Sequence, residues 1–166
     1  MKITFLILTL SLNVAFAQKP YKYVAGNVSV NFLHKPKVMY LGNLSTNILV
    51  RDTNLYSNFV LKYRPLAIKV KSNEIRKIEK VVNDYLTEFV ISMNGYIDER
   101  TTFSKGKTNI QEIKCRFRQG NLILSCKAWI FVNNNFIYQF SNYFAPKTDN
   151  LVLPDQNKFF NSIVIK

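Results

Sequence analysis

The chain is poor in the residues that most catalytic and metal centres require. It has one histidine, His34, and two cysteines, Cys115 and Cys126, in 166 residues. A Ser-His-Asp or Cys-His site would have to use His34, which lies beside Lys35-Pro36 at the expected end of a strand, so a surface position is the favoured interpretation. Zinc sites need more histidine and cysteine than this chain has. The sequence therefore predicts no metal and no cofactor.

Glycine-rich phosphate loops and nucleophile elbows are also missing from the sequence. Asp98 and Glu99 are adjacent acids, which on a strand point to opposite faces and make a poor acid/base pair. Asp52, Asp149 and Asp155 fall in expected turns, where aspartate is common for backbone reasons. We therefore expect a protein that is not an enzyme.

Acidic residues are scarce overall. Ten acids stand against 23 lysines and arginines, so the formal net charge is +13. A basic exported protein can bind an anionic membrane surface, an acidic polymer or an acidic protein. Because the lysines are scattered along the chain, the alternative is that the charge only keeps the protein soluble. We do not expect nucleic acid as the partner of a protein that works outside the cytoplasm.

Only the start of the chain has a long apolar run. Residues 1–17 read MKITFLILTLSLNVAFA, with an early lysine, an apolar stretch and the cleavage signal Ala15-Phe16-Ala17. The stretch is shorter than the about 20 apolar residues of a membrane-spanning helix. We predict a signal peptide cleaved after Ala17, followed by a single domain over residues 18–166. The mature chain is expected in the periplasm or secreted, without a transmembrane segment.

The remaining pattern predicts strands around one long helix. Apolar residues at three- and four-residue steps predict a helix over residues 73–93, capped by Ser72 or Asn73 and ended by Gly95. Pro154 predicts the start of a short helix that runs to about residue 162. The strands are expected at 28–33, 38–41, 46–51, 58–63, 67–70, 96–103, 109–118, 122–132, 136–144 and 163–165. The fold class is therefore α+β, with a mainly antiparallel sheet flanked by a long central helix and a short C-terminal helix.

The two cysteines fall on a predicted hairpin. Gly120-Asn121 is expected to form its two-residue loop, which places Cys115 directly opposite Cys126. Cross-strand partners lie about 4.5–5.5 Å apart, which is close enough for a disulfide. An even number of cysteines in an oxidising compartment favours the same interpretation. We predict a Cys115–Cys126 disulfide, and the alternative is two buried free thiols.

The same register gathers cations on the other face of the hairpin. This face is expected to carry Lys114, Arg116, Arg118, Lys127 and Trp129. Arginine and tryptophan are favoured at protein interfaces, so the face is a candidate partner-binding surface. The alternative is an ordinary solvated face on which a helix covers Trp129.

A series of motifs in the C-terminal half resembles a known family. These are an aromatic strand at 130–132, the asparagine turn 133–135, the Tyr-Gln-Phe strand at 138–140 and Phe-Phe-Asn-Ser at 159–162. Near the start, NVSVNFLHKPKVM gives a strand followed by a Lys-Pro step. The order resembles small exported bacterial proteins related to PsbP, the extrinsic subunit of photosystem II. The resemblance implies an α/β/α sandwich around a mainly antiparallel sheet.

The resemblance implies an accessory or binding protein rather than an enzyme. The same fold also serves a Ran-binding nuclear import factor, so no functional residue carries over. Our leading hypothesis is an exported, non-catalytic accessory or binding module whose partner is a protein or an anionic surface. The alternative is a small-ligand or lipid carrier with an apolar cavity between sheet and helix, lined by some of the 13 Phe and 9 Tyr, unless these are ordinary core residues. A secreted effector or toxin is also compatible with the charge and the export signal.

Overall fold

The computed structural model of the protein describes residues 19–41 and 48–166. The predicted signal peptide, residues 1–17, lies outside the described residues. The elements along the chain are β1 (Tyr21–Ala25), β2 (Val28–Phe32), β3 (Lys37–Tyr40), β4 (Ile48–Thr53), β5 (Ser57–Pro65), α1 (Ile75–Ser92), β6 (Gly95–Lys105), β7 (Thr108–Gln119), β8 (Leu122–Asn133), β9 (Phe136–Phe144), a 3-10 turn (Pro146–Thr148), α2 (Asp149–Asn161) and β10 (Val164–Ile165).

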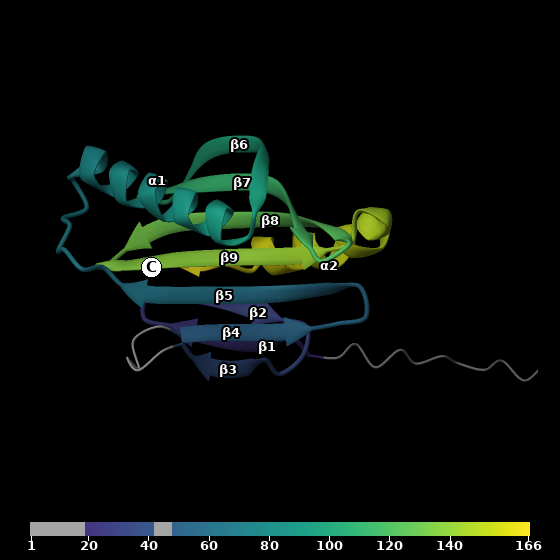
Figure 1. The fold of residues 1–166 in the computed structure, drawn as a ribbon. Helices are drawn as coiled ribbons and strands as arrows, with labels where there is room; N and C mark the ends of the chain where they lie inside the picture. The colour runs from purple at the N-terminus through teal and green to yellow at the C-terminus, as the bar shows by residue number, and fades with distance from the viewer. Residues whose placement is uncertain (1–18, 42–47) are drawn as a thin grey trace, which may run out of the picture.

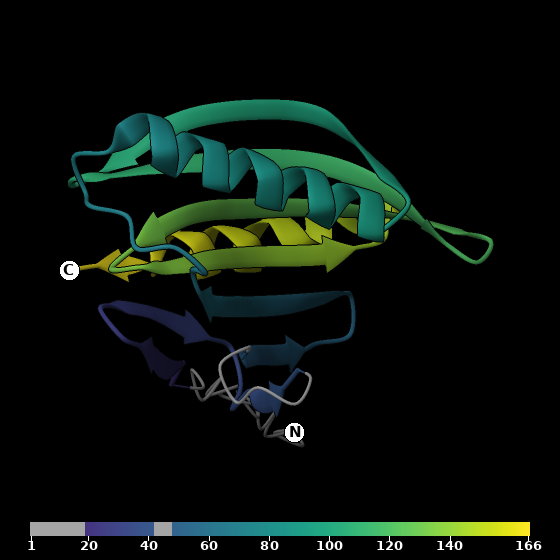
Figure 2. The ribbon, with the colours of Figure 1, turned by 60° about the vertical axis from the view of Figure 1, so that its left-hand side comes forward.

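These strands form two sheets in which neighbouring strands are antiparallel. The larger sheet has the order β3-β4-β5-β9-β8-β7-β6, and the smaller one has the order β1-β2-β10. Helix α1 lies along one face of the larger sheet, while α2 lies on its other side (Figures 1 and 2). The expected α+β fold with mainly antiparallel strands and two helices is therefore confirmed.

Two hydrophobic clusters hold these layers together. Because strand side chains alternate between faces, successive residues of the same strand join different clusters. Helix α1 packs its buried residues on one face of the central strands: Val82, Tyr85, Leu86 and Phe89 against Ile113, Cys115, Cys126, Ala128, Ile130 and Ile137. On the opposite face, α2 and the small sheet enclose an aromatic cluster: Phe32, Phe59, Trp129, Phe131, Tyr138, Phe140, Phe159 and Phe160.

The start of α1 differs from the prediction. Neither Ser72 nor Asn73 caps the helix; the N-cap position is Glu74, which makes no side-chain cap bond, and the helix begins at Ile75. The Glu74 carboxylate instead accepts the backbone N–H of Lys71 at 2.9 Å. The glutamate therefore stabilises the turn that precedes the helix.

The end of α1 also uses a different residue from the one expected. Asn94 adopts the left-handed conformation, with φ of 49°, which asparagine tolerates better than most residues. Gly95 already belongs to β6, and a Cβ atom there would lie 2.8 Å from the carbonyl oxygen of Arg116. The glycine is therefore required by the close approach of β7 and not by its φ angle.

Helix α2 is longer than expected. It spans Asp149–Asn161, 13 residues, and so begins five residues before the expected start at Pro154. Pro154 lies inside the helix and not at its start. A proline is tolerated best in the first turn, where its missing N–H would have no partner. The first turn here contains Asp149, whose negative charge suits a helix N-terminus.

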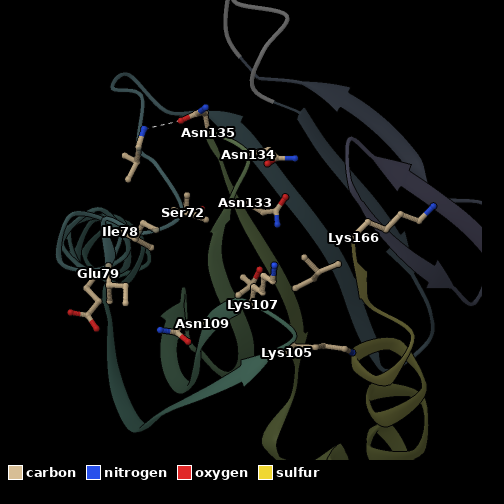
Figure 3. A pocket seen from close by; sticks show the side chains of 15 residues that line it. Ser72, Ile78, Glu79, Lys105, Lys107, Asn109, Asn133, Asn134, Asn135 and Lys166 are labelled. Atoms are coloured by element: carbon tan, nitrogen blue, oxygen red, sulfur yellow. Dashed lines mark hydrogen bonds between the residues drawn. The ribbon is translucent and has the colours of Figure 1, made fainter.

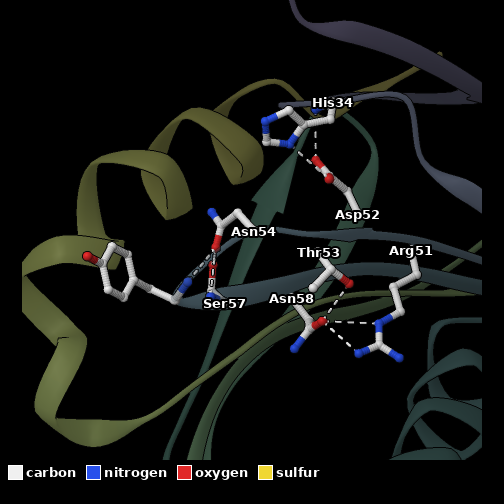
Figure 4. Close-up of polar contacts among 8 residues, drawn as sticks. His34, Arg51, Asp52, Thr53, Asn54, Ser57 and Asn58 are labelled. Carbon is white, nitrogen blue, oxygen red and sulfur yellow. Dashed lines mark hydrogen bonds and ion pairs between the residues drawn. The ribbon is translucent and has the colours of Figure 1, made fainter.

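The only histidine is exposed, as expected, but Asp52 is buried in β4 and not in a turn. The Asp52 carboxylate accepts the backbone N–H of His34 at 2.9 Å, and its second oxygen lies 3.1 Å from His34 Nδ1 (Figure 4). The turn comes two residues later. Asn54 Oδ1 accepts the N–H groups of Tyr56 and Ser57 at 3.0 and 2.7 Å, which closes an Asx turn between β4 and β5.

Candidate functional site

The hairpin of β7 and β8 has the predicted register. Cys115 pairs with Cys126 across the two strands, and Lys114 pairs with Lys127. Gly120, at φ of 60°, occupies the first position of the two-residue turn, as a type II′ hairpin requires. Cys115 and Cys126 pack in the cluster under α1. Because the cations alternate with these cysteines along the strands, the cation-bearing face lies on the other side of the sheet, toward α2.

Trp129 is not exposed on this face. Only 7% of its surface is accessible, because Phe160 of α2 packs on its ring with centroids 5.0 Å apart. The indole Nε1 donates a hydrogen bond of 2.6 Å to Glu112, and the same carboxylate lies 3.0 Å from the Lys127 ammonium. For Trp129 the alternative interpretation therefore holds, in which a helix, here α2, covers the indole.

Two other cations of the face, Lys114 and Arg116, are also matched by acids. Arg116 donates from Nε to Asp98 at 3.0 Å, and Lys114 lies 2.7 Å from Glu99. The Arg116 guanidinium lowers the pKa of Asp98, and the Glu99 carboxylate raises the pKa of Lys114. Two adjacent acids of β6 reach the same face because the pairing with β7 shifts by one residue between Ile97 and Glu99, a β-bulge.

Lys114, Arg116 and Lys127 of this face are therefore held in ion pairs, and partner binding by the face stays a prediction. The face forms one wall of a cleft of about 530 Å³ whose other wall is the start of α2. The residues of this cleft include Asp98, Lys114, Arg116, Lys127, Leu153 and Gln156. Exposed ion pairs of this kind contribute little to stability, about 0–1 kcal/mol each, but they fix the positions of the arginine and lysine side chains.

The end of the hairpin, beside the β7–β8 turn, exposes aliphatic side chains. We call it the hairpin-end patch and define it as Tyr96, Arg116, Arg118, Leu122 and Ile123. Leu122 and Ile123 are 65% and 53% accessible, and no ion pair of Arg118 is found among the described residues. The Arg116 guanidinium carbon lies 5.1 Å from the centre of the Tyr96 ring. Figure 2 shows this hairpin extending beyond the rest of the sheet.

The sequence contains a signal for this patch. Leu122 and Ile123 follow the turn directly and are consecutive. Neighbouring strand residues point to opposite faces, so two consecutive aliphatic residues are both buried only where both faces are covered. The end of a projecting hairpin has no such cover.

The two cysteines lie on the opposite face of the hairpin, under the end of α1. Both are buried, and their thiols are free in this structure. Burial raises the pKa of Cys126 well above its ordinary value. The Cys126 thiol, hydrogen-bonded to Cys115, lowers the pKa of Cys115. The predicted pairing across the hairpin is confirmed, whereas the disulfide stays a prediction.

The middle of α1 packs directly on the sheet. Tyr85 donates a hydrogen bond of 2.8 Å to the buried Gln139, and the surrounding cluster is apolar. The carrier hypothesis, which requires a cavity between sheet and helix, stays a prediction. Among residues 19–41 and 48–166, no three His, Cys, Asp or Glu side chains are grouped to hold a metal ion. Within the same ranges no helix has the length and apolarity to cross a membrane.

Comparison with known proteins gives a fold but no family. No family model and no curated protein matches the sequence. The structure is similar to cyanobacterial PsbP (CyanoP) from Synechocystis, with a TM-score of 0.67 and 10% identity over 93% of this chain and 96% of that one. It is also similar to PA94 of Pseudomonas aeruginosa, a protein of unknown function, with a TM-score of 0.55 and 6% identity over 89% of this chain and 97% of that one.

A third similar structure is a Bacteroides thetaiotaomicron protein, with a TM-score of 0.53 and 12% identity over 87% of this chain. This chain spans about half the length of that protein, 48%. Identities this low establish a shared fold and nothing about function. The chain therefore has a PsbP-like fold, as the resemblance in its sequence implied.

Proposed function

We propose that this chain is an exported, non-catalytic accessory module that docks on a protein partner through the hairpin-end patch. The observation that carries the proposal is the exposure of Leu122 and Ile123 beside Arg118, which has no ion pair within the part of the chain that the structure describes. Burying an aliphatic side chain of this size contributes about 1.5–3 kcal/mol. Export rests on the signal-peptide pattern of residues 1–17.

The arginines of the patch suit a protein interface. Arg116 is held by Asp98 on one side and by the Tyr96 ring on the other, so little side-chain entropy remains to be lost on binding. Ile123 pairs with Arg118 and shares its face, whereas Leu122 points to the opposite face, so a partner has to enclose the hairpin end to contact both. Aromatic residues and arginine beside an apolar side chain are typical of binding hot spots. Arg118 supplies a cation that an acidic group of the partner can match.

An anionic membrane surface is the weaker candidate for this patch. Each basic residue near such a surface contributes about 1 kcal/mol, and the acid Asp98 already neutralises Arg116. Arg118 alone adds too little to anchor the protein, even with two aliphatic residues inserted. We therefore favour a protein partner that offers an apolar pocket with an acidic rim.

The test is capture of a partner from envelope fractions by the tagged protein. We expect the captured protein to be lost with L122S/I123S and weakened with R118E, because these changes remove the apolar contact and reverse the free charge. The matched control is L55S/I68S, which removes two aliphatic residues that are at least as exposed elsewhere. Equal capture by both double variants would contradict the proposal. Binding to anionic vesicles that the same patch variants abolish would identify a membrane instead.

A further inference from the structure

A second cavity lies at the opposite end of the large sheet, where β6 turns into β7 and β8 turns into β9. We call it the Asn-turn cavity; it measures about 480 Å³, a size that suits a small ligand. The start of α1 and the end of β10 complete its walls. The residues on which the argument depends are Ile78, Lys105, Lys107, Val132, Asn133 and Lys166. None of these belongs to the hairpin-end patch.

Three consecutive asparagines have different tasks in this cavity. Asn134 and Asn135 have φ angles of 47° and 61°, which makes a two-residue type I′ turn between β8 and β9. Asn135 also accepts the backbone N–H of Val70 through its Oδ1 and that of Leu66 through its carbonyl oxygen, both at 2.8 Å. These bonds hold residues 66–70 as a loop, where we had expected a strand over 67–70.

The remaining asparagine, Asn133, has no such structural task. Asn133 Oδ1 is buried and has no hydrogen-bond partner among the described residues. Figure 3 shows its side chain at the centre of the cavity wall, between the start of α1 and Lys166. A buried acceptor without a donor costs free energy, so the site favours a ligand that brings an O–H or N–H group to it.

The charge of the lining favours an anion. Lys105, Lys107 and Lys166 line the cavity, and Glu79 is the acid among the lining residues. The Lys105 ammonium lies 5.6 Å from the centre of the Trp129 ring, a cation–π contact that positions it. Burial lowers the pKa of Lys105, which indicates that its ammonium is less well hydrated than those of exposed lysines and gains more from a bound anion.

Five further lining residues are apolar. Side chains from the loop before α1, from α1, from β8 and from β10 meet there: Val70, Ile75, Ile78, Val132 and Ile165. An inorganic ion would leave this surface without contact. A ligand with a carbon skeleton would cover it and reach the lysines at the same time.

We propose that the Asn-turn cavity binds a small hydroxylated organic anion of the sugar-acid class. Its carboxylate lies among Lys105, Lys107 and Lys166, and one of its hydroxyl groups donates to Asn133 Oδ1. The C–H face of the sugar lies against the apolar residues at the start of α1. This site is independent of partner docking, so the two proposals can fail separately.

The first experiment separates the three chemical requirements by titration calorimetry on the purified protein. The probes are glucuronate, galacturonate and gluconate, with glucose and cyclohexanecarboxylate as controls that lack the charge or the hydroxyl groups. We expect at least one sugar acid to bind, and each control to bind at least about tenfold more weakly, as expected for loss of a charged or hydrogen-bonded contact. Absence of binding by all three sugar acids would overturn the proposal, as would equal binding of glucose.

The second experiment locates the bound sugar acid. N133V removes the unpartnered acceptor and K107Q/K166Q removes two cations, and we expect each to weaken binding by about tenfold or more. The matched control is K22Q/K35Q, which lowers the net charge equally at sites outside the cavity. Thermal unfolding of all variants checks that the fold is intact. Equal weakening by both lysine pairs would show non-specific charge attraction and would contradict the assigned site.

Discussion

The two ends of the large sheet differ in how their charges are used. Beside the β7–β8 turn, Asp98, Glu99 and Glu112 pair with the cations of the hairpin face, and only Arg118 remains unmatched there among the described residues. Around the β8–β9 turn, three lysines share a cavity with a single acid, Glu79. Ion pairs with lysine or arginine use seven of the ten acids of the chain. The placement of the few acids, and not the total charge, therefore decides which surfaces are cationic.

The largest effect that we expect concerns the cysteine pair at the hairpin end. If Cys115 and Cys126 are bonded in the exported protein, reduction should lower the free energy of unfolding by about 2–4 kcal/mol, because the disulfide restricts the unfolded chain. Denaturant unfolding with and without dithiothreitol measures this difference. The variant C115A/C126A should be insensitive to the reductant. Two reactive thiols per chain in the denatured, unreduced protein would show that the bond is absent.

The second prediction compares the two turns directly. N135A should destabilise the protein by about 2–3 kcal/mol, because it loses a residue suited to positive φ and leaves the Val70 N–H without its acceptor. G120A, at the hairpin end, should cost about 1–2 kcal/mol from backbone strain alone, since no atom lies within 4 Å of the added Cβ. Chemical denaturation of both variants gives the two values.

N135G is the control for this comparison. It keeps the left-handed backbone and removes only the hydrogen bond to Val70, so its stability should fall between those of the native protein and N135A. If N135A and G120A were equally destabilised, the asparagine turn would have no stabilising role beyond its backbone shape.

The smallest expected effect is the pH dependence of the Asp98–Arg116 pair. The pKa of Asp98 is lowered in the folded state, so the pair stabilises the protein above the unfolded pKa and loses this effect as the pH falls through the lower, folded value. The contribution should stay below about 1 kcal/mol because the pair is largely exposed. Comparing unfolding of D98N and the native protein between about pH 6 and pH 3 isolates it. Identical pH profiles would contradict the prediction.

Several features of the fold could be predicted because they depend on neighbouring residues alone. Gly120-Asn121 determined the register of β7 and β8, and with it the pairing of Cys115 and Cys126. The apolar periodicity identified α1 to within a few residues. The motifs of the C-terminal half led to the PsbP-like fold that the structural similarity supports.

The features that could not be predicted depend on contacts distant in the sequence. Trp129 is buried because Phe160 of α2 packs on it, and Asp98 joins Glu99 on one face because of a bulge in the β6–β7 pairing. Asn135 bonds to Val70, 65 residues away.

Local sequence patterns thus determined most strands, the β7–β8 turn and the cysteine pairing of this protein, because turn conformation and alternation are properties of short segments. The tertiary structure alone decided which charges are neutralised, which aromatic residues are covered and where the cavity lies. Those outcomes depend on which surfaces of α1, α2 and the sheet meet, and such contacts leave no periodic pattern in the chain.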